Sequence, residues 1–162
     1  MNVSQNFDDN DESDLPEDLL IGLANVYKIY RTSEIETVAL RGVSLSLFEE
    51  EIMGVIGPSG SGKTTLVNIM AGLIKPTAGI VYWSTVGADI ARLSDNLVTQ
   101  IRNQFVGIIC QISESNLLPQ LSVIENVMLQ GKIGSQRSSG LKKKALELLD
   151  RVGLKARRNS NP

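Results

Sequence analysis

The sequence has one cysteine, no histidine and no long apolar run. Cys110 cannot form a disulfide within the chain, which agrees with a cytoplasmic location. Because Cys110 ends an apolar run, we interpret it as a core residue rather than a reactive thiol. No segment approaches the apolar length that a membrane span needs, and the acidic start is unlike a signal peptide. We therefore expect a cytoplasmic protein.

A strong positive charge is also missing. The net charge is −2, and residues 1–18 contain seven acidic side chains and no Lys or Arg. The rest of the chain carries 16 basic against 11 acidic side chains, a balance of +5. This balance fits phosphate ligands but is too small to indicate nucleic-acid binding. We interpret residues 1–18 as a disordered acidic tail and residues 19–162 as one domain of ordinary globular composition.

One stretch carries a complete phosphate-binding pattern, G-x-x-x-x-G-K-[ST]. It consists of Gly57, Pro58, Ser59, Gly60, Ser61, Gly62, Lys63, Thr64 and Thr65. The apolar run 52–56 before it is typical of a buried parallel strand. Residues 66–71 after it are predicted to be helical, with Gly72 ending the helix in a left-handed conformation. A strand, a glycine-rich loop and a helix in this order are the context that the pattern requires.

The chemistry of this loop follows from its residue types. Glycines allow successive backbone N–H groups to approach an anion closely, and the following helix N-terminus adds partial positive charge. Lys63 supplies a full charge for the β- and γ-phosphates, and the Thr64 hydroxyl suits Mg²⁺, which prefers oxygen ligands. The alternative is a Gly/Ser-rich turn without a ligand. The pattern and its flanks favour a site for a nucleoside triphosphate with Mg²⁺.

Other segments predict an antiparallel β layer before the loop and helices after it. The expected strands are 19–23, 26–30, 38–40, 43–47, 80–83 and a buried strand over 105–110. One helix is predicted to begin after the N-cap Ser94, with Leu97, Ile101 and Phe105 on one face. A capping box, Ser122 to Glu125, opens a helix to about residue 129; a flexible linker spans 131–140, and the last helix spans 141–152.

The order of these elements resembles the nucleotide-binding subunit of ABC transporters, in particular the subgroup that works with lipoprotein-release and macrolide-efflux type permeases. The resemblance runs from about residue 19 to residue 154. Besides the phosphate loop it rests on residues 37–44, 71–73, 76–77, 92–94, 116–119 and 123–127. The Leu-Leu-Pro and Glu-Asn-Val stretches are the more discriminating part, because many NTPases share the phosphate loop.

The resemblance implies an α/β P-loop NTPase fold. It would be an ABC-type ATPase core with an antiparallel β layer, a partial parallel sheet and, over about residues 112–154, the Q-loop and the start of the helical subdomain. Tyr30 falls where the family places an aromatic residue that stacks on adenine; an ordinary strand tyrosine is the alternative, and Tyr27 is a rival. Gln111 falls at the Q-loop, where the amide reaches Mg²⁺ or the attacking water; an ordinary loop glutamine is the alternative.

The sequence also departs from the family. Residues 111–116 lack the usual aromatic, and the turn 49–51 lacks the usual glycine. The family's second half should carry an LSGGQ signature, an apolar strand ending in Asp-Glu and a switch histidine, and this chain contains none of them. We therefore expect a truncated domain that lacks the C-terminal half, binds ATP and Mg²⁺, and does not hydrolyse ATP alone.

The resemblance also implies partners. We expect a membrane permease subunit as partner, and the ATPase subunit would power export or lipoprotein release through it. The chain would be held peripherally on the inner face of the membrane. A dimer with a complete ATPase subunit is a further expectation, and no nucleic-acid partner is expected. Two other functions stay open at this point: a non-catalytic module that binds a nucleotide or a permease, and a small P-loop kinase. A kinase would need a lid that carries arginines, and the arginines available, Arg137, Arg151, Arg157 and Arg158, do not form a convincing lid pattern.

Overall fold

The computed structural model describes residues 15–109, 117–133 and 140–162. The chain divides into two compact units, residues 1–106 and 107–162, and each is described here by itself. The expected tail 1–18, the Q-loop residue Gln111 and most of the linker 131–140 lie largely or wholly outside the described residues. No described helix is long and apolar enough to cross a membrane.

The first unit is built on one antiparallel sheet of four strands in the order β2-β1-β3-β4. The strands are β1 (Leu19–Arg31), β2 (Glu36–Phe48), β3 (Ala78–Trp83) and β4 (Ala88–Asp89). The four short segments expected before the phosphate loop form two long strands, which β-bulges interrupt. Asn25 and Gly42 lie near these irregularities with positive φ, 48° and 64°. The expected antiparallel layer is therefore confirmed.

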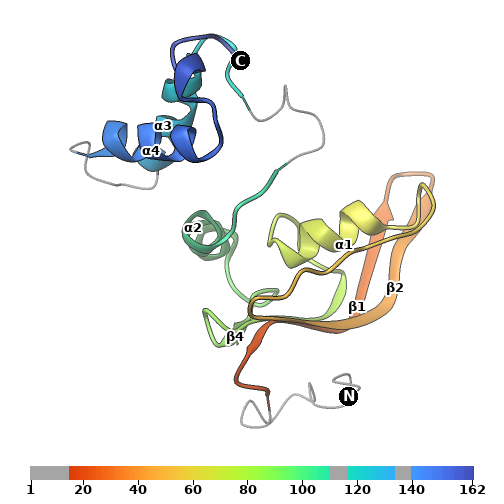
Figure 1. Ribbon diagram of the computed structural model, residues 1–162. Helices are drawn as coiled ribbons and strands as arrows, with labels where there is room; N and C mark the ends of the chain where they lie inside the picture. The colour runs from red at the N-terminus through yellow and green to blue at the C-terminus, as the bar shows by residue number, and fades with distance from the viewer. Residues whose placement is uncertain (1–14, 110–116, 134–139) are drawn as a thin grey trace. The chain divides into compact units, whose positions relative to one another are not determined.

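Helix α1 (Lys63–Met70) lies against this sheet (Figure 1). Its buried residues Leu66 and Ile69 join the core, which contains Leu23, Val26, Leu40, Val81, Trp83, Ile90 and Val98. The indole N–H of Trp83 donates to the Met70 carbonyl at 3.0 Å, so the buried tryptophan also ties β3 to the end of α1. The helix ends as predicted at Gly72, whose φ is +66°.

Helix α2 (Asp95–Phe105) begins at the predicted N-cap, because the Leu97 N–H donates to the Ser94 hydroxyl at 3.4 Å. The predicted apolar face is only partly correct. Ile101 packs against the core, but Leu97 and Phe105 are 43% and 53% exposed, and the buried residue of the helix is Val98. The helix therefore packs on the core of the first unit with the face that carries Val98 and Ile101, next to the predicted face.

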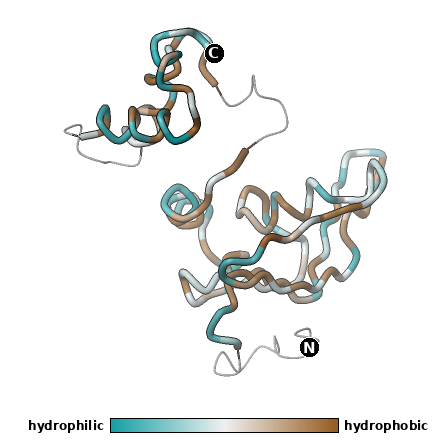
Figure 2. Tube along the Cα trace, in the orientation of Figure 1, coloured by the Kyte–Doolittle hydropathy of each residue, from teal (hydrophilic) through white to brown (hydrophobic). Residues whose placement is uncertain are grey.

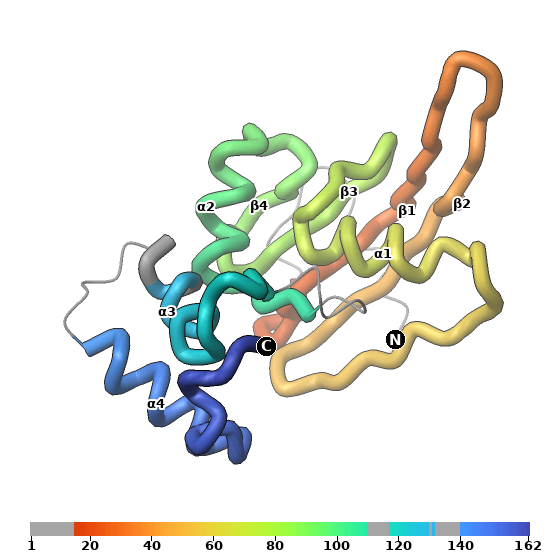
Figure 3. The backbone as a smooth tube through the Cα atoms, turned by 90° about the horizontal axis from the view of Figure 1, so that it is seen from above, coloured from red at the N-terminus to blue at the C-terminus, as the bar shows by residue number. Residues whose placement is uncertain are grey.

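Two predicted strands are not paired. Residues 52–56 and 106–109 take part in no strand of the described sheet, and Phe105 belongs to α2. After β2 the chain reverses and returns as a separate tube before it enters α1 (Figure 3). The parallel pairing expected for these segments is therefore not formed among the described residues. The apolar residues of these segments are typical of buried strands, but a strand also needs a neighbouring strand to hydrogen-bond with.

The second unit contains α3 (Val123–Ile133), α4 (Leu141–Arg151) and a short 3₁₀ turn, Lys155–Arg157. The capping box is present, since Glu125 accepts from both the backbone N–H and the hydroxyl of Ser122. Helix α3 extends beyond the predicted end near residue 129, into the expected linker. Leu141, Ala145 and Leu149 are the buried residues of α4. Gly153, with a φ of 73°, follows the helix as predicted.

Gly72 gives a test of this packing. Besides its positive φ, a Cβ there would lie 3.0 Å from Trp83 and 3.1 Å from Val98. We expect Gly72→Ala to lower the free energy of unfolding by about 2–4 kcal/mol, from left-handed strain plus overpacking. Urea unfolding followed by the fluorescence of Trp83, the single tryptophan, measures the change.

Gly87→Ala is the matched control. Gly87 has a similar φ of +63°, but a Cβ there would meet nothing within 4 Å. We therefore expect Gly87→Ala to cost only the left-handed strain, about 1–2 kcal/mol. Equal losses in the two variants would contradict the packing role of Gly72.

Candidate functional site

The glycines of the phosphate loop give it a backbone that exposes N–H groups. Gly60 and Gly62 have φ values of 79° and 88°, in the left-handed region that favours glycine. The first bond within α1 runs from the Leu66 N–H to the Gly62 carbonyl at 2.9 Å. The N–H groups of residues 63–65 therefore precede the helical bonding pattern and have no acceptor within the helix. They form the positive end of α1 and suit an anion.

The end of the loop lies directly on β2. A Cβ built on Gly62 would be 2.4 Å from the Ala39 carbonyl oxygen and 3.1 Å from a methyl carbon of Leu40. Only a glycine fits such a close approach between two backbones. Since Leu40 and Leu66 belong to the same core, the sheet fixes the position of the helix N-terminus.

Lys63 closes the loop on itself. Its ammonium group donates to the carbonyl oxygens of Gly57 at 2.8 Å and Pro58 at 2.7 Å. Both acceptors belong to the same phosphate loop, so the charge lies beside the exposed amides rather than in an ion pair. The structure thus brings the predicted loop residues together on one turn in front of α1.

The two threonines of the loop differ in exposure. Thr64 is exposed and Thr65 is half-buried. The Thr64 hydroxyl makes no hydrogen bond with any residue that the structure describes, so its oxygen is available to a ligand. Within the described ranges no group of three His, Cys, Asp or Glu side chains is arranged to hold a metal ion. Gln111, the other predicted metal contact, lies outside those ranges.

Tyr30 and its rival Tyr27 are almost equally exposed, at 44% and 42%. Their surroundings differ. The ammonium group of Lys28 lies 5.3 Å from the centroid of the Tyr30 ring, a cation–π distance. The Tyr27 hydroxyl lies 2.8 Å from the position of a Cβ on Gly42, so that side chain packs over β2. The Lys28 ammonium group therefore lies over one face of the Tyr30 ring. The Tyr27 side chain instead packs against Gly42 of β2.

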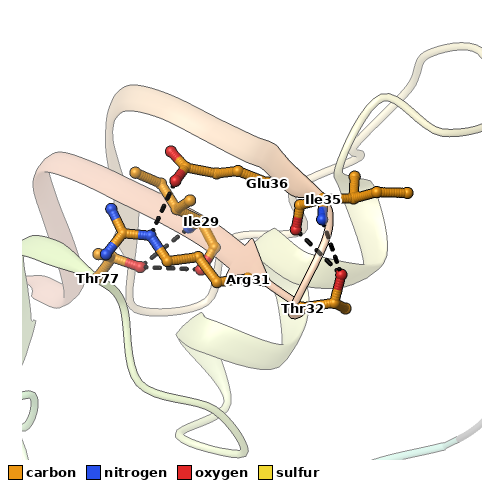
Figure 4. Close-up of polar contacts among 6 residues, drawn as sticks. All are labelled: Ile29, Arg31, Thr32, Ile35, Glu36 and Thr77. Carbon is orange, nitrogen blue, oxygen red and sulfur yellow. Dashed lines mark hydrogen bonds and ion pairs between the residues drawn. The ribbon is translucent and has the colours of Figure 1, made fainter.

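Polar contacts hold the tip of the β1–β2 hairpin next to Tyr30 (Figure 4). Arg31 pairs with Glu36 at 3.0 Å. The Thr32 hydroxyl accepts from the Ile35 N–H at 3.1 Å, which closes the turn. Both interactions lie on the surface, so we assign them to the shape of the turn rather than to a large gain in stability.

Thr77 clamps β1 from the other side, and sequence reasoning gave it no separate role. Its hydroxyl accepts from the Ile29 N–H at 3.0 Å (Figure 4). Its own N–H donates to the Tyr27 carbonyl at 2.8 Å. The residue thus ties the segment between the two tyrosines to the loop that follows α1. The only signal in the sequence was the Pro76-Thr77 pair after the helix.

Comparisons with known proteins agree with this geometry. The family model described as ABC transporter matches residues 40–162. An uncharacterized ABC transporter ATP-binding protein of Thermotoga maritima is 41% identical over 140 residues, which are 86% of this chain and 58% of the relative. The lipoprotein-releasing system ATP-binding protein LolD of Hydrogenovibrio crunogenus is 37% identical over 145 residues, 90% of this chain and 61% of the relative. The chain thus spans about three fifths of these curated relatives.

Solved structures show the same architecture. The ATP-binding cassette MJ0796, in a dimeric post-hydrolysis state bound to ADP and Pi, is 35% identical with a TM-score of 0.78. The alignment covers 88% of this chain and 62% of that one. The cbiO1 protein of Clostridium perfringens, part of the cbiONQ transporter complex, shares the fold with a TM-score of 0.72 at 23% identity, over 90% of this chain and 55% of that one. The predicted fold class is therefore confirmed.

Thr77 provides a test of the clamp on β1. We expect Thr77→Val, which keeps the shape but removes the acceptor for the Ile29 N–H, to lower the free energy of unfolding by about 1 kcal/mol or somewhat more. Amide exchange at Ile29 should accelerate, because its hydrogen-bond acceptor is lost. Thr77→Ser keeps the hydroxyl and should restore slow exchange. Unchanged exchange at Ile29 in Thr77→Val would show that this bond contributes nothing.

Proposed function

Because this chain belongs to the ABC transporter ATP-binding family, we propose that it binds ATP with Mg²⁺ as part of a subunit that powers a membrane permease. The observation that carries this proposal is the phosphate loop: amides exposed in front of α1, with the Lys63 ammonium group beside them. Family membership replaces the small P-loop kinase that the sequence had left open.

The backbone amides and the Lys63 side chain of the loop have different roles in binding the triphosphate. The backbone N–H groups of residues 63–65 and of the glycine turn donate hydrogen bonds to the phosphate oxygens, since those of residues 63–65 have no acceptor within the helix. Lys63 leaves the Gly57 and Pro58 carbonyls for the β- and γ-phosphates. This exchange favours binding because a charge-assisted hydrogen bond to phosphate is stronger than one to a neutral carbonyl.

The Thr64 hydroxyl fits a role at Mg²⁺. It is a hard oxygen donor, it is exposed, and no described residue occupies it. Thr64 would hold Mg²⁺, which would supply positive charge to offset the charge of the phosphates. Gln111 remains the second proposed contact, through its resemblance to the Q-loop glutamine.

We assign binding of the adenine ring of ATP to Tyr30. The ring is exposed enough to offer a face to adenine, and it lies on the strand next to β2, which the phosphate loop touches at Ala39. Lys28 lies over the ring and adds a positive charge to this end of the sheet. Tyr27 is the weaker candidate because its hydroxyl packs over Gly42.

The partner that fits this family is a permease of the lipoprotein-release or macrolide-efflux type. Its support is the similarity to two lipoprotein-releasing system ATP-binding proteins, at 37% and 33% identity. The chain would then act on the cytoplasmic side of the membrane, and a complete ATPase subunit would be its dimer partner. A non-catalytic role in binding the nucleotide or the permease remains the second candidate.

Calorimetric titration with Mg-ATP tests the role of the lysine. We expect Lys63→Ala to weaken binding at least tenfold, since hydrogen bonds to charged groups contribute about 1.5–3 kcal/mol. Lys75→Ala is the matched control: Lys75 also donates to a carbonyl, that of Leu93 at 2.7 Å, but outside the loop. Equal affinities in the wild type and Lys63→Ala would overturn the proposed site.

A second titration separates the base from the phosphates. We expect Tyr30→Ala to weaken Mg-ATP by about 5- to 100-fold, the range of base–aromatic stacking at 1–3 kcal/mol. Binding of inorganic tripolyphosphate with Mg²⁺ should not change, because it has no base. If Tyr27→Ala shows this pattern instead, Tyr27 is the stacking residue.

A further inference from the structure

The Tyr30 side chain has no hydrogen bond that holds its ring in one orientation. It lies next to the turn of the β1–β2 hairpin, where hydrophilic colour prevails (Figure 2). In the described ranges its hydroxyl has no hydrogen-bond partner. The cation–π contact with the Lys28 ammonium group, 5.3 Å from the ring centroid, is therefore the polar interaction that can fix the plane of the ring.

The ammonium group of Lys28 is itself held in place. It donates to the backbone carbonyl oxygen of Lys75 at 2.7 Å. Thr77 fixes the loop that supplies this oxygen to β1, because it bonds to the backbone of the residues on both sides of Lys28. In the part of the chain that the structure describes, Lys28 forms no ion pair with a carboxylate, so its charge is available to the ring.

The two faces of the Tyr30 ring are therefore unequal, since the Lys28 ammonium group lies over one of them. We propose that Lys28 is a positioning residue of the adenine site: it holds the ring by one face, and the base stacks on the other. This inference rests on the proposed role of Tyr30 in binding ATP. A ring that is already held loses less conformational entropy when the base stacks on it, which strengthens binding.

The alternative role for Lys28 is that of a charge that attracts the triphosphate directly. Such a charge would act without the Tyr30 ring, and it would act equally on a ligand that has no base. Arg31 offers a matched control, because it carries the same charge directly after Tyr30. Its guanidinium group pairs with Glu36 at 3.0 Å.

Calorimetric titrations with Mg-ATP test the positioning role. We expect Lys28→Met to weaken Mg-ATP about 2- to 5-fold, the range of a cation–π contact at an exposed site, and to leave binding of tripolyphosphate with Mg²⁺ unchanged. Lys28→Arg should restore the wild-type affinity, because a guanidinium group also lies over aromatic rings and can donate to a carbonyl. Arg31→Met should bind Mg-ATP as the wild type does.

A double-mutant cycle shows whether Lys28 acts through the ring. In the Tyr30→Ala background, Lys28→Met should cause no additional loss of affinity, because there is no ring to hold. NMR spectra of the chain without nucleotide give an independent measurement. The ring current of Tyr30 should shift the ε-methylene protons of Lys28 upfield, and Tyr30→Leu should abolish this shift.

The outcomes separate this inference from the proposed function. Equal affinities of the wild type and Lys28→Met, or an unchanged position of the ε-methylene protons in Tyr30→Leu, overturn the positioning role. It is also overturned if the loss in Lys28→Met recurs in the Tyr30→Ala background, with tripolyphosphate or in Arg31→Met, since Lys28 would then act as a charge. In these cases a loss of affinity in Tyr30→Ala still supports the adenine site. If the wild type binds no Mg-ATP, the proposed function fails and the positioning role fails with it.

Discussion

The packing of α1 on the sheet is the constraint on which the other features of the first unit depend. Leu66 and Ile69 bury one face of the helix against residues of β1, β2 and β3. Trp83 fixes its C-terminal end by a hydrogen bond to the Met70 carbonyl, and Gly62 brings its N-terminal end against Ala39 of β2. A helix held at both ends keeps its unbonded amides in one place, which is what recognition of an anion requires.

Much of this arrangement was predictable because its signals are local. The glycine pattern, the N-cap Ser94, the helix end at Gly72 and the capping box at Ser122 each depend on a few neighbouring residues, and the structure contains all of them. The antiparallel layer followed from β-prone segments and a short turn. Similarity to known cassettes then added the fold class, which local signals alone do not determine.

The parts that sequence reasoning placed less well depend on distant residues. Residues 52–56 have the composition of a buried strand, but a strand needs a partner, and none of the described residues provides one. Leu97 and Phe105 have helical spacing, yet the helix turns Val98 to the core because packing against the sheet decides the face. Thr77 was not singled out, because its role depends on a hydrogen bond with Ile29, a residue far from it in the sequence.

The order of the strands has a consequence for the way the chain folds. β1 is made first but lies inside the sheet, with β2 on one side and β3 on the other. Its pairing with β2 needs only the short turn 32–35, whereas Leu23 meets Val81 only after the loop and α1 have been made. Contacts between residues so far apart in the chain slow folding because their loop must close first. On the ribosome, the hairpin therefore emerges with one long edge open, and it stays open until β3 leaves the exit tunnel.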